Sequence, residues 1–115
     1  MIWFLRIAFS VVVLSMLCVT SWASAHIALW KTPEAVVTHP WFIATLFDCY
    51  FGFLTFYVWL AYKETSLLAR IIWLLAILAL GNIAMASYVL WIVLRLPSNA
   101  PIEAVLLRRS QQKAV

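Results

Sequence analysis

The sequence predicts an all-α integral membrane protein, a bundle of three transmembrane helices, on the strength of two observations. Of the 115 residues, 67% are hydrophobic and only 10% are charged, which lies far outside the balance of a soluble domain. Three apolar stretches, at about residues 4–25, 41–62 and 68–94, are each long enough to cross a bilayer, since a span needs roughly 20 residues. These stretches use most of the chain, so we expect one transmembrane domain over residues 1–115.

The first stretch, residues 4–25, also has features of a secretory signal peptide. Arg6 precedes an apolar core, and Ala23 to Ala25 form an A-x-A-like cleavage site. Against cleavage, the apolar core is long and the bulky Trp22 lies just before that site. We expect the segment to be retained as a span, and cleavage is the alternative.

The second stretch, residues 41–62, follows a loop that contains two signals for the start of a helix. Thr32 before Pro33 fits an N-cap followed by proline at the first helical position, and Thr38 or His39 before Pro40 repeats the pattern. We expect a short interfacial turn after the first signal and the second span after the other. Aromatic residues near both ends of this span fit belts at the two membrane faces, namely Trp30, Trp41, Trp59 and Tyr62.

The third stretch, residues 68–94, follows the short link KETSLLAR, so the second and third spans should be antiparallel neighbours. Residues 95–115 form a tail with a weakly amphipathic centre, which we expect to be an interfacial turn. With three spans, a cytoplasmic N-terminus would place three Lys or Arg residues inside and five outside, against the positive-inside rule. The signal-like first span favours that orientation nonetheless, and the sequence leaves the orientation open.

Asp48 is the main candidate for a functional residue, because it lies inside the apolar second span. Seven residues of helix separate it from Trp41, which places it about 10 Å below the membrane interface. A carboxylate at the centre of a span costs about 2.5 to 3.5 kcal/mol to insert, so it should face protein and have a partner. Steps of three and four residues place Thr45, Asp48 and Gly52 on one stripe, which we expect to face the third span.

The third span offers a partner for this carboxylate. Gly81 and Asn82 interrupt its apolar run near the middle, and Asn82 shares a face with Ala86. Small residues let membrane helices approach closely, so we expect Gly52, Gly81 and Ala86 to pack between helices. Asn82 and Thr45 are then the expected hydrogen-bond partners of Asp48. Asp48 is either a polar staple that fixes the register of the helices or an acid that binds a proton or a ligand.

Other kinds of chemistry have little support in the sequence. The basic residues are spread singly around the spans, so we expect no nucleic-acid binding. His26 and His39 flank the first loop, where we expect neither a metal nor a cofactor, and His39 fits a cap of the second span. Cys18 and Cys49 are expected to pack as small apolar residues rather than to form a disulfide. The sequence contains no hydrolase, metalloprotease or phosphate-loop motif.

Three segments carry a resemblance to a known family. They are W-F-x-x-T-L-F-D from Trp41 to Asp48, the aromatic stretch from Tyr50 to Phe53, and L-G-N-x-x-M-A from Leu80 to Ala86. Together they resemble a family of small membrane proteins of unknown function that occurs in bacteria and, in longer form, in plants. The resemblance implies short spans and no assigned activity.

The functional expectation follows from how little of the chain lies outside the spans. Few residues remain to build a water-accessible active site, so we expect a protein that is not an enzyme. Its expected role is that of an accessory subunit of a larger membrane complex, or of a self-associating bundle, in the bacterial inner membrane. The alternative is a small transporter or proton-conducting component that uses Asp48.

Overall fold

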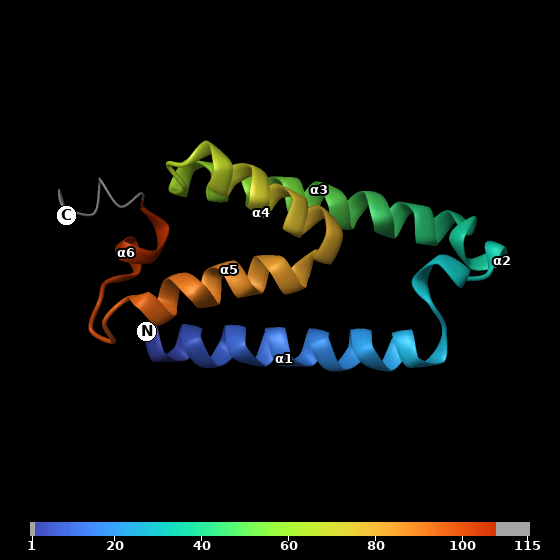
Figure 1. Ribbon diagram of the computed structural model, residues 1–115, viewed down its shortest axis with the longest axis horizontal. Coiled ribbons are helices and arrows are strands. Elements are labelled where there is room, and N and C mark those ends of the chain that lie inside the picture. Colours follow the sequence, from blue (N-terminus) through green and yellow to red (C-terminus); the bar gives the residue numbers. More distant parts are fainter. Residues whose placement is uncertain (1, 108–115) are drawn as a thin grey trace.

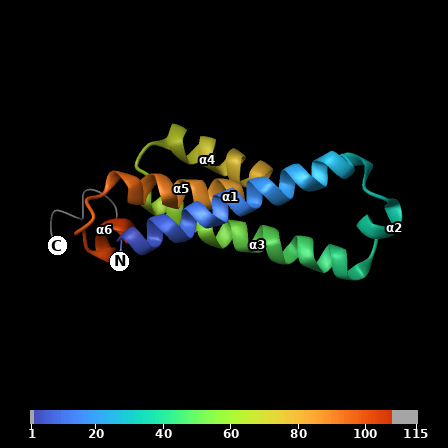
Figure 2. The same cartoon turned by 90° about the horizontal axis from the view of Figure 1, so that it is seen from below.

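The computed structural model describes residues 2–107, which form helices joined by short loops and turns (Figure 1). Two long helices, α1 (Ile2–His26) and α3 (Pro40–Lys63), run in opposite directions along the long axis of the molecule (Figure 1 and Figure 2). At one end they are connected by the 3-10 turn η1 (Leu29–Lys31) and the short helix α2 (Glu34–Val37). The prediction of an all-α fold is confirmed.

The prediction of one continuous helix over residues 68–94 is wrong. This segment forms two helices, α4 (Leu67–Leu80) and α5 (Asn82–Arg95), which fold back on each other as a hairpin (Figure 1). Gly81 forms the turn with a φ of 59°, a conformation that glycine adopts far more readily than other residues. A Cβ atom at Gly81 would lie only 2.8 Å from the Phe53 ring of α3, so the turn also needs the absence of a side chain.

Within residues 2–107, only α1 and α3 are long and apolar enough to cross a membrane. Helices α4 and α5 have 14 residues each, which corresponds to about 21 Å of helix. Both open ends of the hairpin lie at the same end of the molecule as the start of α1 and the short helix α6 (Ile102–Leu106) (Figure 1). The described residues thus contain two helices of spanning length and a hairpin of two shorter helices, and the three-span bundle is not confirmed.

Helix α5 is the central element of the core. It packs against α1 on one side and against α3 and α4 on the other (Figure 1 and Figure 2). It consequently carries most of the buried side chains, whereas α3 and α4 contribute one fully buried residue each, Leu60 and Ile77. The buried residues of α5 are Ala84, Ala86, Tyr88, Val89, Ile92 and Val93.

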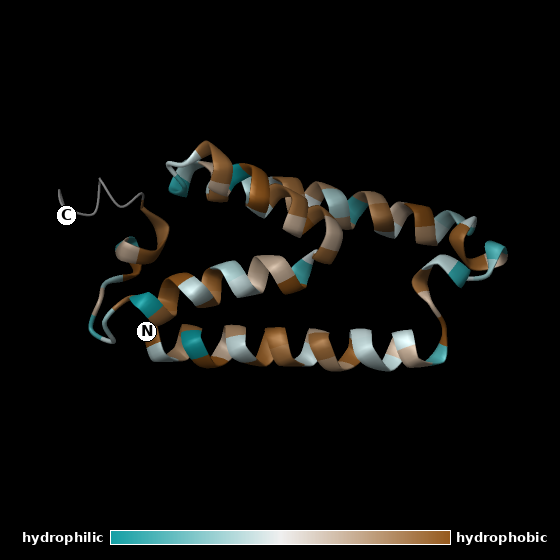
Figure 3. Ribbon diagram, viewed as in Figure 1, coloured by the Kyte–Doolittle hydropathy of each residue, from teal (hydrophilic) through white to brown (hydrophobic). Residues whose placement is uncertain are grey.

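Beyond the hairpin turn, the halves of α1 and α3 nearest α2 have no third helix between them (Figure 1). Every residue from Leu17 to His26 and from Ile43 to Gly52 is exposed. The exposed surface of these halves is largely apolar, and hydrophilic residues gather mainly at the two ends of the molecule (Figure 3). The fold is thus compact around the hairpin and open at its other end.

Candidate functional site

Asp48 is exposed and lies in the half of α3 that extends beyond the core of the chain. The residues of α3 that pack against the core are Phe53, Phe56, Tyr57, Trp59 and Leu60, all of which follow Asp48 along the helix. At about 100° per residue, the twelve steps from Asp48 to Leu60 place the two side chains about 120° apart around the helix. Phe47 and Phe51 are also exposed, whereas the Tyr50 hydroxyl donates to the Leu78 carbonyl of α4 at 3.5 Å.

The structure does not bring together the three residues of the expected polar cluster, Asp48, Asn82 and Thr45. The Thr45 hydroxyl donates to the Trp41 carbonyl of its own helix at 2.8 Å. Asn82 is exposed at the start of α5, and in the described part of the chain no hydrogen bond joins it to Asp48. The hairpin meets α3 on another face: its turn lies against the Phe53 ring, and the Tyr50 hydroxyl donates to the Leu78 carbonyl at 3.5 Å. Both residues project about 140° or more around the helix from Asp48.

The three residues expected to pack between helices have different surroundings. Gly81 is buried at the hairpin turn, and Ala86 is buried in α5 with 4% of its surface exposed. Gly52 is exposed, and a Cβ atom placed on it would meet no atom within 4 Å. Gly52 therefore belongs to the same open surface as Asp48.

We define the outer face of α3 as Thr45, Asp48, Gly52 and Thr55, all of which are exposed and follow one another at helical spacing. The Thr55 hydroxyl donates to the Phe51 carbonyl at 2.8 Å, as Thr45 does to Trp41. Both threonine hydroxyls are therefore used within α3. Among residues 2–107, no hydrogen bond or ion pair reaches the carboxylate of Asp48.

A second group of polar side chains, which the sequence reading missed, joins the helices at the open end of the hairpin. The Tyr88 hydroxyl of α5 donates to the Glu64 carboxylate at 2.8 Å. Arg70 of α4 donates to the Glu64 carbonyl at 3.0 Å, and the Tyr57 hydroxyl of α3 donates to the Arg70 carbonyl at 3.0 Å. Tyr88 lies 24 residues from Glu64 inside an apolar run, so no local motif indicates this contact.

Two basic side chains bind the carbonyl ends of helices in the same region. Arg6 of α1 donates from Nε to the Val93 carbonyl at 3.1 Å and from Nη2 to the Leu96 carbonyl at 2.5 Å, at the end of α5. Lys63 of α3 donates to the Leu107 carbonyl at 2.8 Å, just after α6. Cations at these positions satisfy free carbonyls and the negative end of the helix dipole. These bonds fix α5 and α6 to the two long helices.

Residues 1–114 match the family described as "Protein of unknown function (DUF1475)". The chain belongs to this family. The match confirms the resemblance seen in the sequence as far as a family of unknown function is concerned. No curated protein and no solved structure matches the DUF1475 chain.

The described part of this DUF1475 protein holds no group of three His, Cys, Asp or Glu side chains that could bind a metal ion. His39 caps α3 by accepting from the Trp41 backbone N–H at 3.2 Å, which confirms the cap expected there. Cys18 and Cys49 are free and exposed.

A hollow of about 340 Å³ opens between the ends of α3 and α5, and Lys63, Glu64 and Arg95 contribute to its lining. The outer face of α3 remains the candidate site, because it exposes a carboxylate, Asp48, within an apolar helix and no hydrogen bond or ion pair of residues 2–107 reaches it.

Proposed function

We propose that this DUF1475 protein is a non-enzymatic integral membrane protein that crosses the bilayer with α1 and α3. Both helices have the length of a span, with 25 and 24 residues. Their outward surfaces are rich in large apolar side chains, which water would solvate poorly. In Figure 3 hydrophobic colours predominate along the ribbons of the helices, as expected for helices in contact with lipid.

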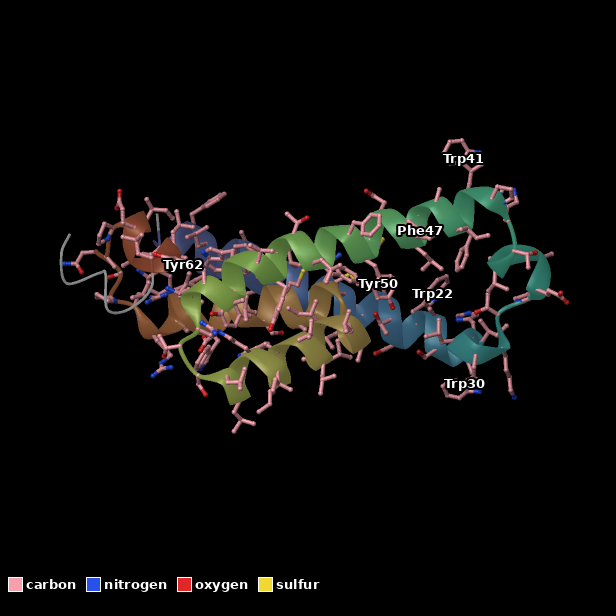
Figure 4. All side chains as sticks on the ribbon, turned by 90° about the horizontal axis from the view of Figure 1, so that it is seen from above. Trp22, Trp30, Trp41, Phe47, Tyr50 and Tyr62 are labelled. Carbon is pink, nitrogen blue, oxygen red and sulfur yellow. The ribbon has the colours of Figure 1, made fainter. Side chains whose placement is uncertain are left out.

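Aromatic side chains near the ends of the two long helices support the same proposal. In Figure 4, Trp22, Trp30 and Trp41 gather around the end that carries α2, and Tyr62 lies toward the opposite end. Trp30 and Trp41 are 86% and 77% exposed, so they are free to contact headgroups. Tryptophan and tyrosine are enriched at both membrane interfaces because their rings are amphipathic.

The exposed carboxylate of Asp48 is the observation that carries the functional proposal. On a spanning helix, a carboxylate that faces lipid costs about 2.5 to 3.5 kcal/mol to insert near the bilayer centre. Contact with a polar group of another helix removes much of this cost. The outer face of α3 is therefore proposed to be the surface on which a partner helix packs, and Gly52 allows its close approach.

The charge of Asp48 favours a different protein over a second copy as the partner. In a symmetric pair of α3 helices, Asp48 would approach another Asp48, and two carboxylates close together cannot both ionise readily. A partner helix with a basic or hydrogen-bonding side chain at this depth avoids that conflict. We therefore favour an accessory subunit of a larger membrane complex.

Photo-crosslinking on two faces of α3 tests this proposal. A photoreactive amino acid replaces Thr45 on the outer face or, as the matched control, Phe47, which is exposed on another face of the same helix. After illumination of cells, the probe at position 45 should give a discrete heavier band and the probe at position 47 should not. Mass spectrometry of that band then identifies the partner.

A second variant links the crosslink to the carboxylate. In the Asp48→Leu background the band from position 45 should weaken strongly, because the partner loses its polar contact. A crosslinked band at twice the mass of the chain would show that the partner is a second copy. The protein would then be a self-associating bundle and not an accessory subunit. Purification as a lone monomer, with no crosslink from position 45, would contradict both.

A further inference from the structure

The hairpin gathers the basic residues of the described chain at one end of the molecule. Arg6 binds carbonyls at the end of α5, which places it beside Arg95. Arg70 binds the Glu64 carbonyl directly after Lys63, the last residue of α3. Among residues 2–107, the remaining basic residue is Lys31, at the opposite end beside α2.

The turn at Gly81 is the reason for this grouping. In a continuous third span, Arg95 would lie at the opposite membrane face from Arg6, Lys63 and Arg70. Because α5 returns along α4, the described Lys and Arg residues instead divide four to one between the two ends. Residues 108–115 lie outside the described residues and are not needed for this division.

The acidic residues do not cancel the difference in positive charge between the two ends of the molecule. The four basic residues at the open end of the hairpin are accompanied by two acids, Glu64 and Glu103. At the α2 end, Lys31 is balanced by Glu34. Arg95 is exposed, with its guanidinium 4.7 Å from the centre of the Trp91 ring, an arrangement suited to the membrane interface.

We infer that the end with Arg6, Lys63, Arg70 and Arg95 faces the anionic, cytoplasmic side of the membrane. Short segments rich in Lys and Arg are retained on that side, and its negative lipids attract them. The α4–α5 hairpin then enters and leaves the bilayer from the cytoplasm, and residues 27–39 lie on the other side. This inference rests on the proposed membrane insertion but not on the proposed partner.

Cysteine labelling in bacterial inner-membrane vesicles tests this orientation. Cys18 and Cys49 are first replaced by alanine, and single cysteines are placed at three exposed positions, Ala35→Cys, Thr65→Cys and Ser98→Cys. A membrane-impermeant maleimide should label only Ala35→Cys in right-side-out vesicles. In inverted vesicles it should label only Thr65→Cys and Ser98→Cys.

Each contrary pattern overturns a separate part of the inference. The reversed pattern would overturn the orientation. Labelling of Thr65→Cys and Ser98→Cys from opposite sides would overturn the hairpin and restore a continuous third span. The crosslink from position 45 is scored separately, so loss of the partner would leave the labelling pattern unchanged, and a failed orientation would leave the crosslink intact.

Discussion

The ring centres of Trp73 in α4 and Tyr88 in α5 lie 4.9 Å apart, with an angle of 76° between the ring planes. In a continuous helix, the fifteen residues between them would correspond to about 22 Å along the axis. The contact therefore exists only because the chain reverses at Gly81. An edge-to-face pair of this kind contributes about 0.5–1.5 kcal/mol beyond the burial of its area, and it holds the two arms of the hairpin together.

Tyr88→Phe should destabilise the hairpin while keeping its ring contacts. The substitution removes the hydroxyl that donates to Glu64, a loss of about 1 kcal/mol in the free energy of unfolding. Denaturant titration of the purified protein in detergent, followed by tryptophan fluorescence, measures the change. Glu64→Ala should add little further loss in the Tyr88→Phe background, and full additivity of the two substitutions would show that these side chains do not interact.

Gly81→Ala should lower the free energy of unfolding by more than about 1 kcal/mol. The new Cβ would meet the Phe53 ring at 2.8 Å, and alanine strongly disfavours a φ of 59°. Thermal unfolding in detergent provides the measurement.

Gly52→Ala is the matched control, because its Cβ would meet no atom within 4 Å and the residue lies within α3. In the isolated chain, Gly52→Ala should leave the free energy of unfolding unchanged or raise it by up to about 1 kcal/mol. The same substitution should weaken the crosslink from position 45, because it thickens the outer face of α3. Equal stability losses for the two glycine variants would contradict a special role for the turn.

Arg6→Ala should loosen the end of α5. Its two bonds to the Val93 and Leu96 carbonyls are charge-assisted, so their loss should cost about 1–3 kcal/mol. Hydrogen exchange followed by mass spectrometry should show faster exchange in the last turn of α5. Arg95→Ala is the control, because this exposed side chain lies over the Trp91 ring on the surface. If it lowered the free energy of unfolding as much as Arg6→Ala does, the capping role of Arg6 would be contradicted.

Lys63→Met should release α6 without unfolding α3. The ammonium donates to the Leu107 carbonyl at 2.8 Å, and the Trp59 indole donates to the Leu106 carbonyl at 3.0 Å. Lys63 also donates to the Ala104 carbonyl at 3.4 Å, so methionine keeps the aliphatic stem but removes both bonds of the ammonium and leaves that of Trp59. Limited proteolysis should therefore cut residues 96–107 faster than in the wild type, while the far-UV spectrum stays nearly unchanged.

The sequence predicted the helical class and both ends of α3 well, because those signals are local. Proline at the first position, His39 as the cap and Lys63 before a polar link all mark helix boundaries without reference to other segments. The hairpin could not be predicted in the same way. Residues 68–94 are apolar throughout and long enough to span, and Gly81 alone distinguishes one long helix from two short ones.

The surroundings of Asp48 could not be predicted from the sequence for a related reason. The spacing of Thr45, Asp48 and Gly52 predicts that they share one face of the helix, but a polar stripe does not indicate which neighbour it meets. The core of the chain instead receives Phe53, Tyr57 and Leu60, because the hairpin packs mainly against the second half of α3. The contact between Glu64 and Tyr88 was also invisible, since it depends on the chain reversal between them.

The half-length of the α4–α5 hairpin gives the molecule a tapered cross-section. Near the open end of the hairpin, four helices lie side by side, whereas only α1 and α3 continue to the α2 end (Figure 1 and Figure 2). Embedded as proposed, the chain would occupy about twice as much area in one leaflet as in the other. Such a wedge leaves more room for lipid tails in the leaflet that holds its narrow half. It favours a bilayer that bends toward that leaflet, unless another helix fills the gap.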